Sequence, residues 1–110
     1  TPSLAEVLES LYLWNVTEND MAPALKPEDW VLLDTSLSAR ATVQEHGVYL
    51  VRIRPDDPPV LRRLATDPLS GDLILAVEAA GRVPMRIPCP PKGPSKYLLG
   101  RALWVGARVI

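Results

Sequence analysis

The 110-residue sequence contains no phenylalanine, one cysteine and one histidine. The single cysteine, Cys89, excludes a disulfide within the chain and is typical of proteins in the reducing cytoplasm, where we expect this one. Together with His46 it falls short of a zinc ligand set, so we expect no metal and no cofactor. The sequence also has no run of about 18 apolar residues, and we therefore predict no membrane-spanning segment.

An excess of positive charge is missing as well. Twelve Lys and Arg residues face thirteen Asp and Glu residues, which gives a net charge of −1 at pH 7. Surfaces that bind nucleic acid by neutralising phosphates are normally strongly basic, so we do not expect this chain to hold DNA by itself. The length and a hydrophobic content of 47% predict one globular domain over residues 1–110.

The apolar residues predict a mostly-β fold. Seven segments rich in branched and aromatic residues are typical of strands, with turn residues between them. These segments are residues 11–16, 29–34, 47–53, 60–66, 71–78, 82–87 and 97–110. Ser3 and Glu6 predict a capping box and one short N-terminal helix. Segments 47–53 and 60–66 predict a hairpin across a proline-rich turn, and Gly100 and Gly106 predict bends or bulges in the last strand.

Residues 17–34 read TENDMAPALKPEDWVLLD. Residues 19–34 of this stretch resemble the signature G-D-S-M-x-P-x-L-x-x-G-D-x-V-L-V-D of the LexA and phage-repressor family of self-cleaving serine peptidases, whose first position, the glycine, falls on Glu18. The positions that match are Met21, Pro23, Leu25, Asp29, Val31, Leu32 and Asp34. Segments 47–53, 60–66 and 98–110 resemble later family motifs in the same order, so the resemblance covers nearly the whole chain.

This resemblance implies a twisted β-sheet or half-barrel of the LexA C-terminal type. In that family the domain forms homodimers and follows a helix-turn-helix domain, which here lies outside the chain and through which alone DNA would be bound. Active members use a serine nucleophile and a lysine base to cut an Ala-Gly bond of the same chain, upstream of the serine. The only Ala-Gly pair here, at 80–81, lies downstream of the serine position.

The sequence departs from the family at both catalytic positions. Asp20 replaces the serine and Arg62 replaces the lysine. Arginine has a pKa above about 12 and stays protonated, so it cannot act as the base. We therefore expect no catalytic residue and no enzymatic activity. We expect instead that Asp20 and Arg62 form an ion pair across the former active site; the alternative is two solvated charges. The residues expected to line the former cleft are Met21, Pro23, Trp30 and Arg63.

The C-terminal segment holds more apolar residues than one strand needs to cover its own core. Such a surplus indicates a partner surface, although burial on both faces within one monomer would also explain it. The resemblance implies that this strand contributes to the dimer contact. The candidate interface residues are Leu99, Arg101, Leu103, Trp104 and Val105.

These observations favour a non-catalytic domain that dimerises a transcriptional regulator. One alternative is a docking module whose degenerate cleft binds a peptide or a partner protein, for example by strand addition. A residual self-cleaving peptidase is the third. The neighbours Ser95 and Lys96 offer another serine and lysine, but adjacent side chains in a loop rarely point at one another.

Overall fold

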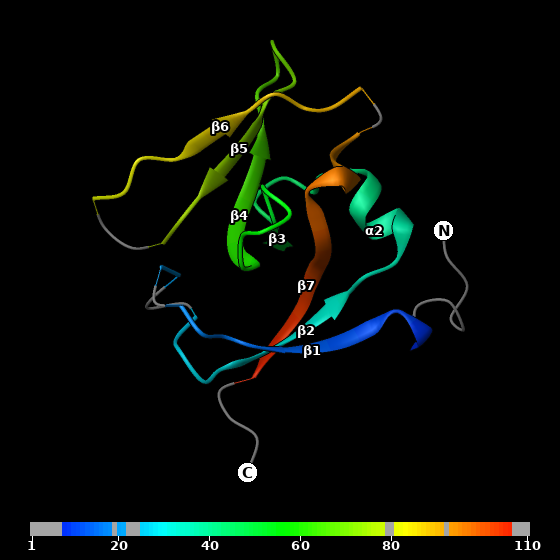
Figure 1. Ribbon diagram of the computed structural model, residues 1–110, viewed down its shortest axis with the longest axis vertical. Coiled ribbons are helices and arrows are strands. Elements are labelled where there is room, and N and C mark those ends of the chain that lie inside the picture. Colours follow the sequence, from blue (N-terminus) through cyan, green and yellow to red (C-terminus); the bar gives the residue numbers. More distant parts are fainter. Residues whose placement is uncertain (1–7, 19, 22–24, 79–80, 92, 107–110) are drawn as a thin grey trace.

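The computed structural model describes residues 8–18, 20–21, 25–78, 81–91 and 93–106. In this part of the chain seven antiparallel strands form one sheet in the order β1-β2-β7-β3-β4-β5-β6 (Figure 1). The strands are β1 Leu11–Asn15, β2 Trp30–Asp34, β3 Val48–Val51, β4 Val60–Thr66, β5 Leu73–Ala76, β6 Met85–Ile87 and β7 Leu98–Gly106. A helix, α2, spans Leu37–Ala41, and a 3₁₀ helix, η1, spans Pro94–Lys96. No described helix is long and apolar enough to cross a membrane.

The mostly-β prediction is confirmed, because each predicted segment contains one strand. The bounds of β4 coincide with the prediction, and β3 and β4 form the expected hairpin, in which Tyr49 lies opposite Arg62. Most of the predicted N-terminal helix lies outside the described residues. Only its end, at Leu8 and Glu9, is described, and these two residues are helical. The chain then enters β1 at Leu11.

The longest strand, β7, joins the two parts of the sheet. Its beginning pairs with β3 and its end pairs with β2. The pairing is irregular at two places, where Leu99 and Leu103 have no partner in register. The first irregularity lies beside Gly100, as predicted. The second lies at Leu103, which was not predicted, and the expected bend at Gly106, the last described residue of β7, stays a prediction. Bulges increase strand twist, and in Figure 1 β1 runs steeply across the direction of β4.

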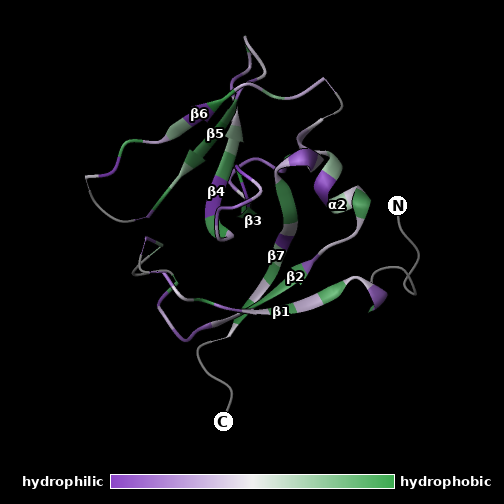
Figure 2. Cartoon of the chain, viewed as in Figure 1, coloured by the Kyte–Doolittle hydropathy of each residue, from purple (hydrophilic) through white to green (hydrophobic). Residues whose placement is uncertain are grey.

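Two apolar clusters form the core. Neighbouring residues of a strand point to opposite faces of the sheet, so Leu50 belongs to one cluster and Tyr49 and Val51 to the other. The first cluster contains Val16, Met21, Leu25, Val31, Leu33, Leu50 and Leu61. The second contains Tyr49, Val51, Leu64, Leu73, Leu75 and Leu98. Figure 2 shows hydrophobic residues along most strands and a hydrophilic band across β4.

Helix α2 begins directly after β2 and is capped at Ser36. The buried carboxylate of Asp34, at the end of β2, accepts a hydrogen bond from the backbone N–H of Ser36 at 2.9 Å. The hydroxyl of Ser36 then caps the helix by accepting from the backbone N–H of Ala39. Both contacts satisfy polar groups at the helix entry.

Candidate functional site

Arg62 of β4 is the centre of a charged cluster. Its Nη2 donates to Oδ2 of Asp20 at 3.2 Å, and its Nη1 donates to Oε1 of Glu18 at 2.5 Å. The side chains of Arg62 and Glu18 are each 15% exposed and that of Asp20 is 29% exposed. The predicted ion pair between Asp20 and Arg62 is therefore present, and these residues are not two separate solvated charges.

Glu18 is the closer partner of Arg62, and the sequence analysis did not predict it. Its Oε2 also accepts the backbone N–H of Leu61 at 3.1 Å. Pairing of β4 with β5 begins only at Arg63, so Leu61 lies on a stretch of β4 that β5 does not cover. Glu18 satisfies this backbone donor and holds Arg62 with the same carboxylate. An acid at a position where the family motif has glycine was the signal that could have indicated this role.

A second arginine completes the cluster. Nη1 of Arg82 lies 3.2 Å from Oδ1 of Asp20, so each oxygen of this carboxylate faces a guanidinium group. The four side chains carry two negative and two positive charges. A carboxylate paired in this way is a weak nucleophile, and neither arginine can accept a proton. The arrangement is suited to holding the loop before Met21 against β4. It does not place a nucleophile next to a group that could accept its proton.

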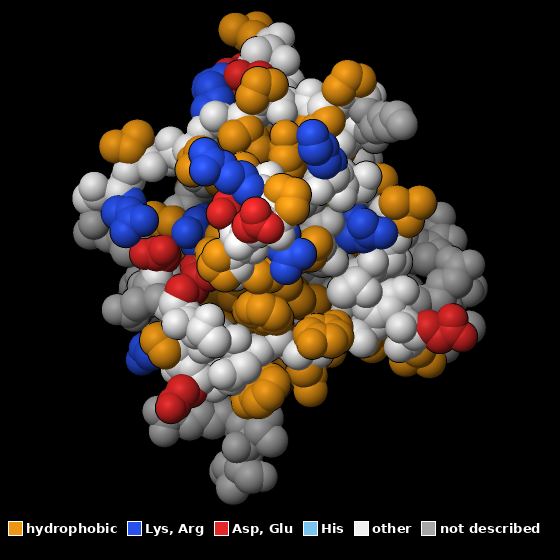
Figure 3. All heavy atoms as spheres, in the orientation of Figure 1, with side chains coloured by type: hydrophobic (Ala, Val, Ile, Leu, Met, Phe, Trp, Pro, Cys, Tyr) orange, Lys and Arg blue, Asp and Glu red, His pale blue; other side chains and the backbone are white. Residues whose placement is uncertain are grey.

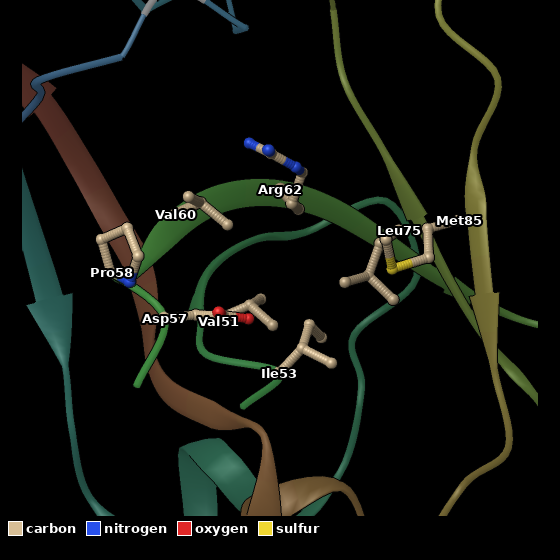
Figure 4. A pocket seen from close by; sticks show the side chains of 8 residues that line it. All are labelled: Val51, Ile53, Asp57, Pro58, Val60, Arg62, Leu75 and Met85. Carbon is tan, nitrogen blue, oxygen red and sulfur yellow. The ribbon is translucent and has the colours of Figure 1, made fainter. Parts of the chain in front are cut away.

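An apolar cavity of about 230 Å³ lies beside Arg62. In Figure 4 the guanidinium of Arg62 points away from the apolar side chains of this cavity. The other residues that line it are Val51, Ile53, Asp57, Pro58, Val60, Leu75 and Met85. Because the wall is mainly aliphatic, the cavity is suited to an apolar group.

Three of the four residues predicted to line the former cleft are described, and none of the three lines the cavity beside Arg62. Met21 is fully buried in the first core cluster, so it supports the fold. Trp30 lines a different hollow with Tyr12. Arg63 points to the opposite face of β4 from Arg62 and forms an ion pair with Glu78, with 2.7 Å between Nη2 and Oε1. Pro23 lies outside the described residues.

The candidate interface residues of β7 divide into two groups. Leu99 is half-buried against the first core cluster, and half-buried Arg101 donates to Oε1 of Gln44 at 3.1 Å. In contrast, Leu103, Trp104 and Val105 are exposed by 45%, 58% and 42%. The exposed apolar side chains of β7 therefore lie only at its end.

The exposed end of β7 continues onto β1. Leu13 lies opposite Leu32 of β2, and Leu32 lies opposite Trp104. Opposed residues of neighbouring strands share a face of the sheet, so Leu13 and Trp104 lie on the same face. Tyr12 and Leu13 are more than half exposed. The sequence analysis did not single out β1 as part of this surface, because the order of strands in a sheet is not visible in one sequence.

Other candidate sites give little chemistry. Ser95 and Lys96 lie next to each other in η1, and no hydrogen bond between their side chains occurs in the described structure. Among the described residues, no group of three His, Cys, Asp or Glu side chains is placed to hold a metal ion.

No protein-family model and no curated protein sequence matches this chain. The likeness to the LexA family, drawn from the motifs, stays a prediction.

Proposed function

We propose that this chain is a non-catalytic assembly domain that pairs two copies of a LexA-like transcriptional regulator in the cytoplasm, with the DNA-binding part outside the chain. The observation that carries the proposal is an exposed apolar surface on β1 and β7. We call this surface the apolar strip and define it as Leu13, Leu103 and Trp104.

The position of the apolar strip supports a partner interface. Exposed apolar residues scattered singly are ordinary on protein surfaces, whereas contiguous ones indicate a contact. Leu13 and Trp104 lie on the same face of the sheet, in strands separated only by β2, and Leu103 is the neighbour of Trp104 at the irregularity of β7. Figure 3 shows hydrophobic side chains gathered over the region where β1, β2 and β7 cross.

A second copy of the chain is the occupant that fits this surface best. The three side chains of the apolar strip carry no formal charge, so the strip meets an identical strip without repulsion between like charges. A two-fold contact places the same patch of both copies face to face. Burial of a Leu or Trp side chain contributes about 1.5–3 kcal/mol before the entropy of association is subtracted.

The charged cluster supports the non-catalytic part of the proposal. The position of the family nucleophile is occupied by Asp20, whose oxygens face two arginines. The position of the family base is occupied by Arg62, which stays protonated. A regulator built on this domain would need a signal other than self-cleavage, such as a partner protein or a ligand.

Sedimentation equilibrium over a wide concentration range tests the proposal. We expect the average mass to rise reversibly with concentration from that of one chain to that of two. A mass that stays at one chain at high concentration would overturn the proposal.

The cavity beside Arg62 favours a second candidate function, docking of a peptide or partner protein. Its aliphatic wall, formed by residues such as Val51, Val60 and Leu75, would accept one apolar side chain of an extended segment. This function predicts a monomer that binds a peptide, whereas assembly predicts a dimer without one. Sedimentation of the chain alone therefore separates the two.

A further inference from the structure

A basic pocket lies on a different part of the molecule from the charged cluster and the apolar strip. It forms where the residues after β3 meet η1 and the start of β7, and it encloses about 250 Å³. Its lining residues are Arg52, Ile53, Arg54, Pro55, Lys96, Tyr97 and Leu99. Three of them are cations and none is an acid. This composition differs from that of the whole chain, whose net charge is −1.

Arg52 lines this pocket, and one nitrogen of its side chain has no hydrogen-bond partner in the described structure. Its backbone N–H donates to the carbonyl of Tyr97 at 2.9 Å, which joins the two sides of the pocket. Its side-chain Nε is buried and has no hydrogen-bond partner within the described structure. Buried polar groups are almost always hydrogen-bonded, so a donor of this kind calls for an acceptor. Because this Nε has no accessible surface, an anion in the pocket would bind Arg52 through the terminal nitrogens of its guanidinium group.

The other two cations are also without acidic partners. In the described part of the chain, no carboxylate lies within ion-pair distance of Arg52, Arg54 or Lys96. Lys96 holds its ammonium 5.5 Å from the centre of the Tyr97 ring, a distance at which the ring attracts the cation. The ammonium is therefore kept near the pocket, which carries three positive charges with no compensating negative charge.

We propose that the basic pocket binds the phosphate group of a small phosphorylated molecule. A phosphate monoester carries between about 1.5 and 2 negative charges at neutral pH, which suits three cations better than the single charge of a carboxylate does. Guanidinium groups bind phosphate oxygens in pairs, and a lysine adds a point charge. The enclosed shape favours a small molecule over nucleic acid, which is bound along extended basic surfaces.

This proposal does not depend on the assembly function. Titration of the ¹⁵N-labelled chain with inorganic phosphate, against sodium chloride at equal ionic strength, tests it by NMR. We expect saturable shifts of the amides of Arg52, Ile53, Lys96 and Tyr97 with phosphate, and much smaller shifts with chloride. Acetate at the same concentration should bind more weakly than phosphate.

Matched variants separate the pocket from general charge attraction. Lys96→Gln should weaken phosphate binding about tenfold, because a hydrogen bond to a charged group is lost. Lys26→Gln removes the same charge from an exposed turn outside the pocket and should change binding by less than about twofold. Exposed Arg54 gives a second variant, Arg54→Gln, which should act like Lys96→Gln and does not disturb a buried side chain.

Four results would overturn the proposal. The first is the absence of saturable binding of phosphate, and the second is an equal loss of binding in Lys96→Gln and Lys26→Gln. The third is acetate binding as tightly as phosphate, which would make the pocket a general anion site. The fourth is binding of a single-stranded oligonucleotide with much higher affinity than phosphate, which would assign the surface to nucleic acid.

Discussion

Nη1 of Arg62 lies 2.5 Å from Oε1 of Glu18, although the two residues are 44 positions apart in the chain. Glu18 is less exposed than Asp20 and also accepts a backbone N–H from β4. The contact therefore ties the loop between β1 and β2 to the centre of the sheet.

Replacement of Glu18 should cost more stability than replacement of Asp20. Glu18→Gln leaves a half-buried arginine with a neutral partner and should lower the free energy of unfolding by about 2 kcal/mol. Asp20→Asn removes a longer and more exposed contact and should cost less than about 1 kcal/mol. Urea denaturation of both variants measures the difference. A larger loss for Asp20→Asn would contradict the geometry of the cluster.

The chain should not cut itself, even at alkaline pH. A lysine base becomes partly deprotonated near its ordinary pKa of about 10.4, whereas Arg62 keeps its proton there. Intact-mass spectrometry after long incubation near pH 10 should therefore show only the full-length chain. The matched variant Asp20→Ala should give the same spectrum. Fragments that accumulate in the natural chain and are absent in Asp20→Ala would show that Asp20 has catalytic activity.

Gly106→Ala should displace the indole of Trp104. A Cβ atom at Gly106 would overlap Cη2 of Trp104, so the ring must move. Because Trp104 belongs to the apolar strip, we expect the resonance of its indole N–H to shift and dimer association to weaken roughly tenfold. NMR and sedimentation measure the two effects. An unchanged indole resonance would contradict the contact between Trp104 and Gly106.

The carboxyl group of Asp67, in the turn between β4 and β5, should have a lowered pKa. The side-chain hydrogen bond from Arg86 lowers the pKa of Asp67 to about 2, with further help from the backbone N–H groups of Leu69 and Ser70. The contribution of Asp67 to stability is therefore present above its unfolded pKa of about 3.9 and is lost as the pH falls toward the folded value.

Carbon-13 NMR of the Asp67 carboxyl group measures this pKa. Arg86→Gln should raise it toward its ordinary value, while Arg82→Gln, a variant of an exposed arginine paired with Asp20 instead, should leave it unchanged. A pKa of Asp67 that does not respond to Arg86→Gln would show that the backbone groups alone lower it.

Much of the strand pattern could be predicted from the sequence, because each strand is a local signal. The segment 60–66 became β4 without a shift, since Leu61 and Leu64 mark buried positions and prolines precede it. Helix α2 was less visible because five residues are too few to show helical periodicity. Its start depends on the buried carboxylate of Asp34, which the sequence does not reveal.

The candidate site was predicted only in part, because its contacts span the chain. A family motif suggested that Asp20 and Arg62 meet, but no local pattern connects Glu18 to β4 or Arg82 to Asp20. The basic pocket likewise brings Arg52 and Lys96 together through the pairing of β3 with β7. Side-chain alternation along β4 does explain why Arg63 points away from the cluster.

The most direct test of the central claim, assembly through the apolar strip, is sedimentation equilibrium of two matched variants. Leu103→Asp places a charge in the strip, and Leu69→Asp places the same charge at a 97%-exposed leucine in the turn between β4 and β5. We expect Leu103→Asp to be monomeric at concentrations where the natural chain and Leu69→Asp are dimers. Equal masses for both variants and the natural chain would contradict assembly through this strip.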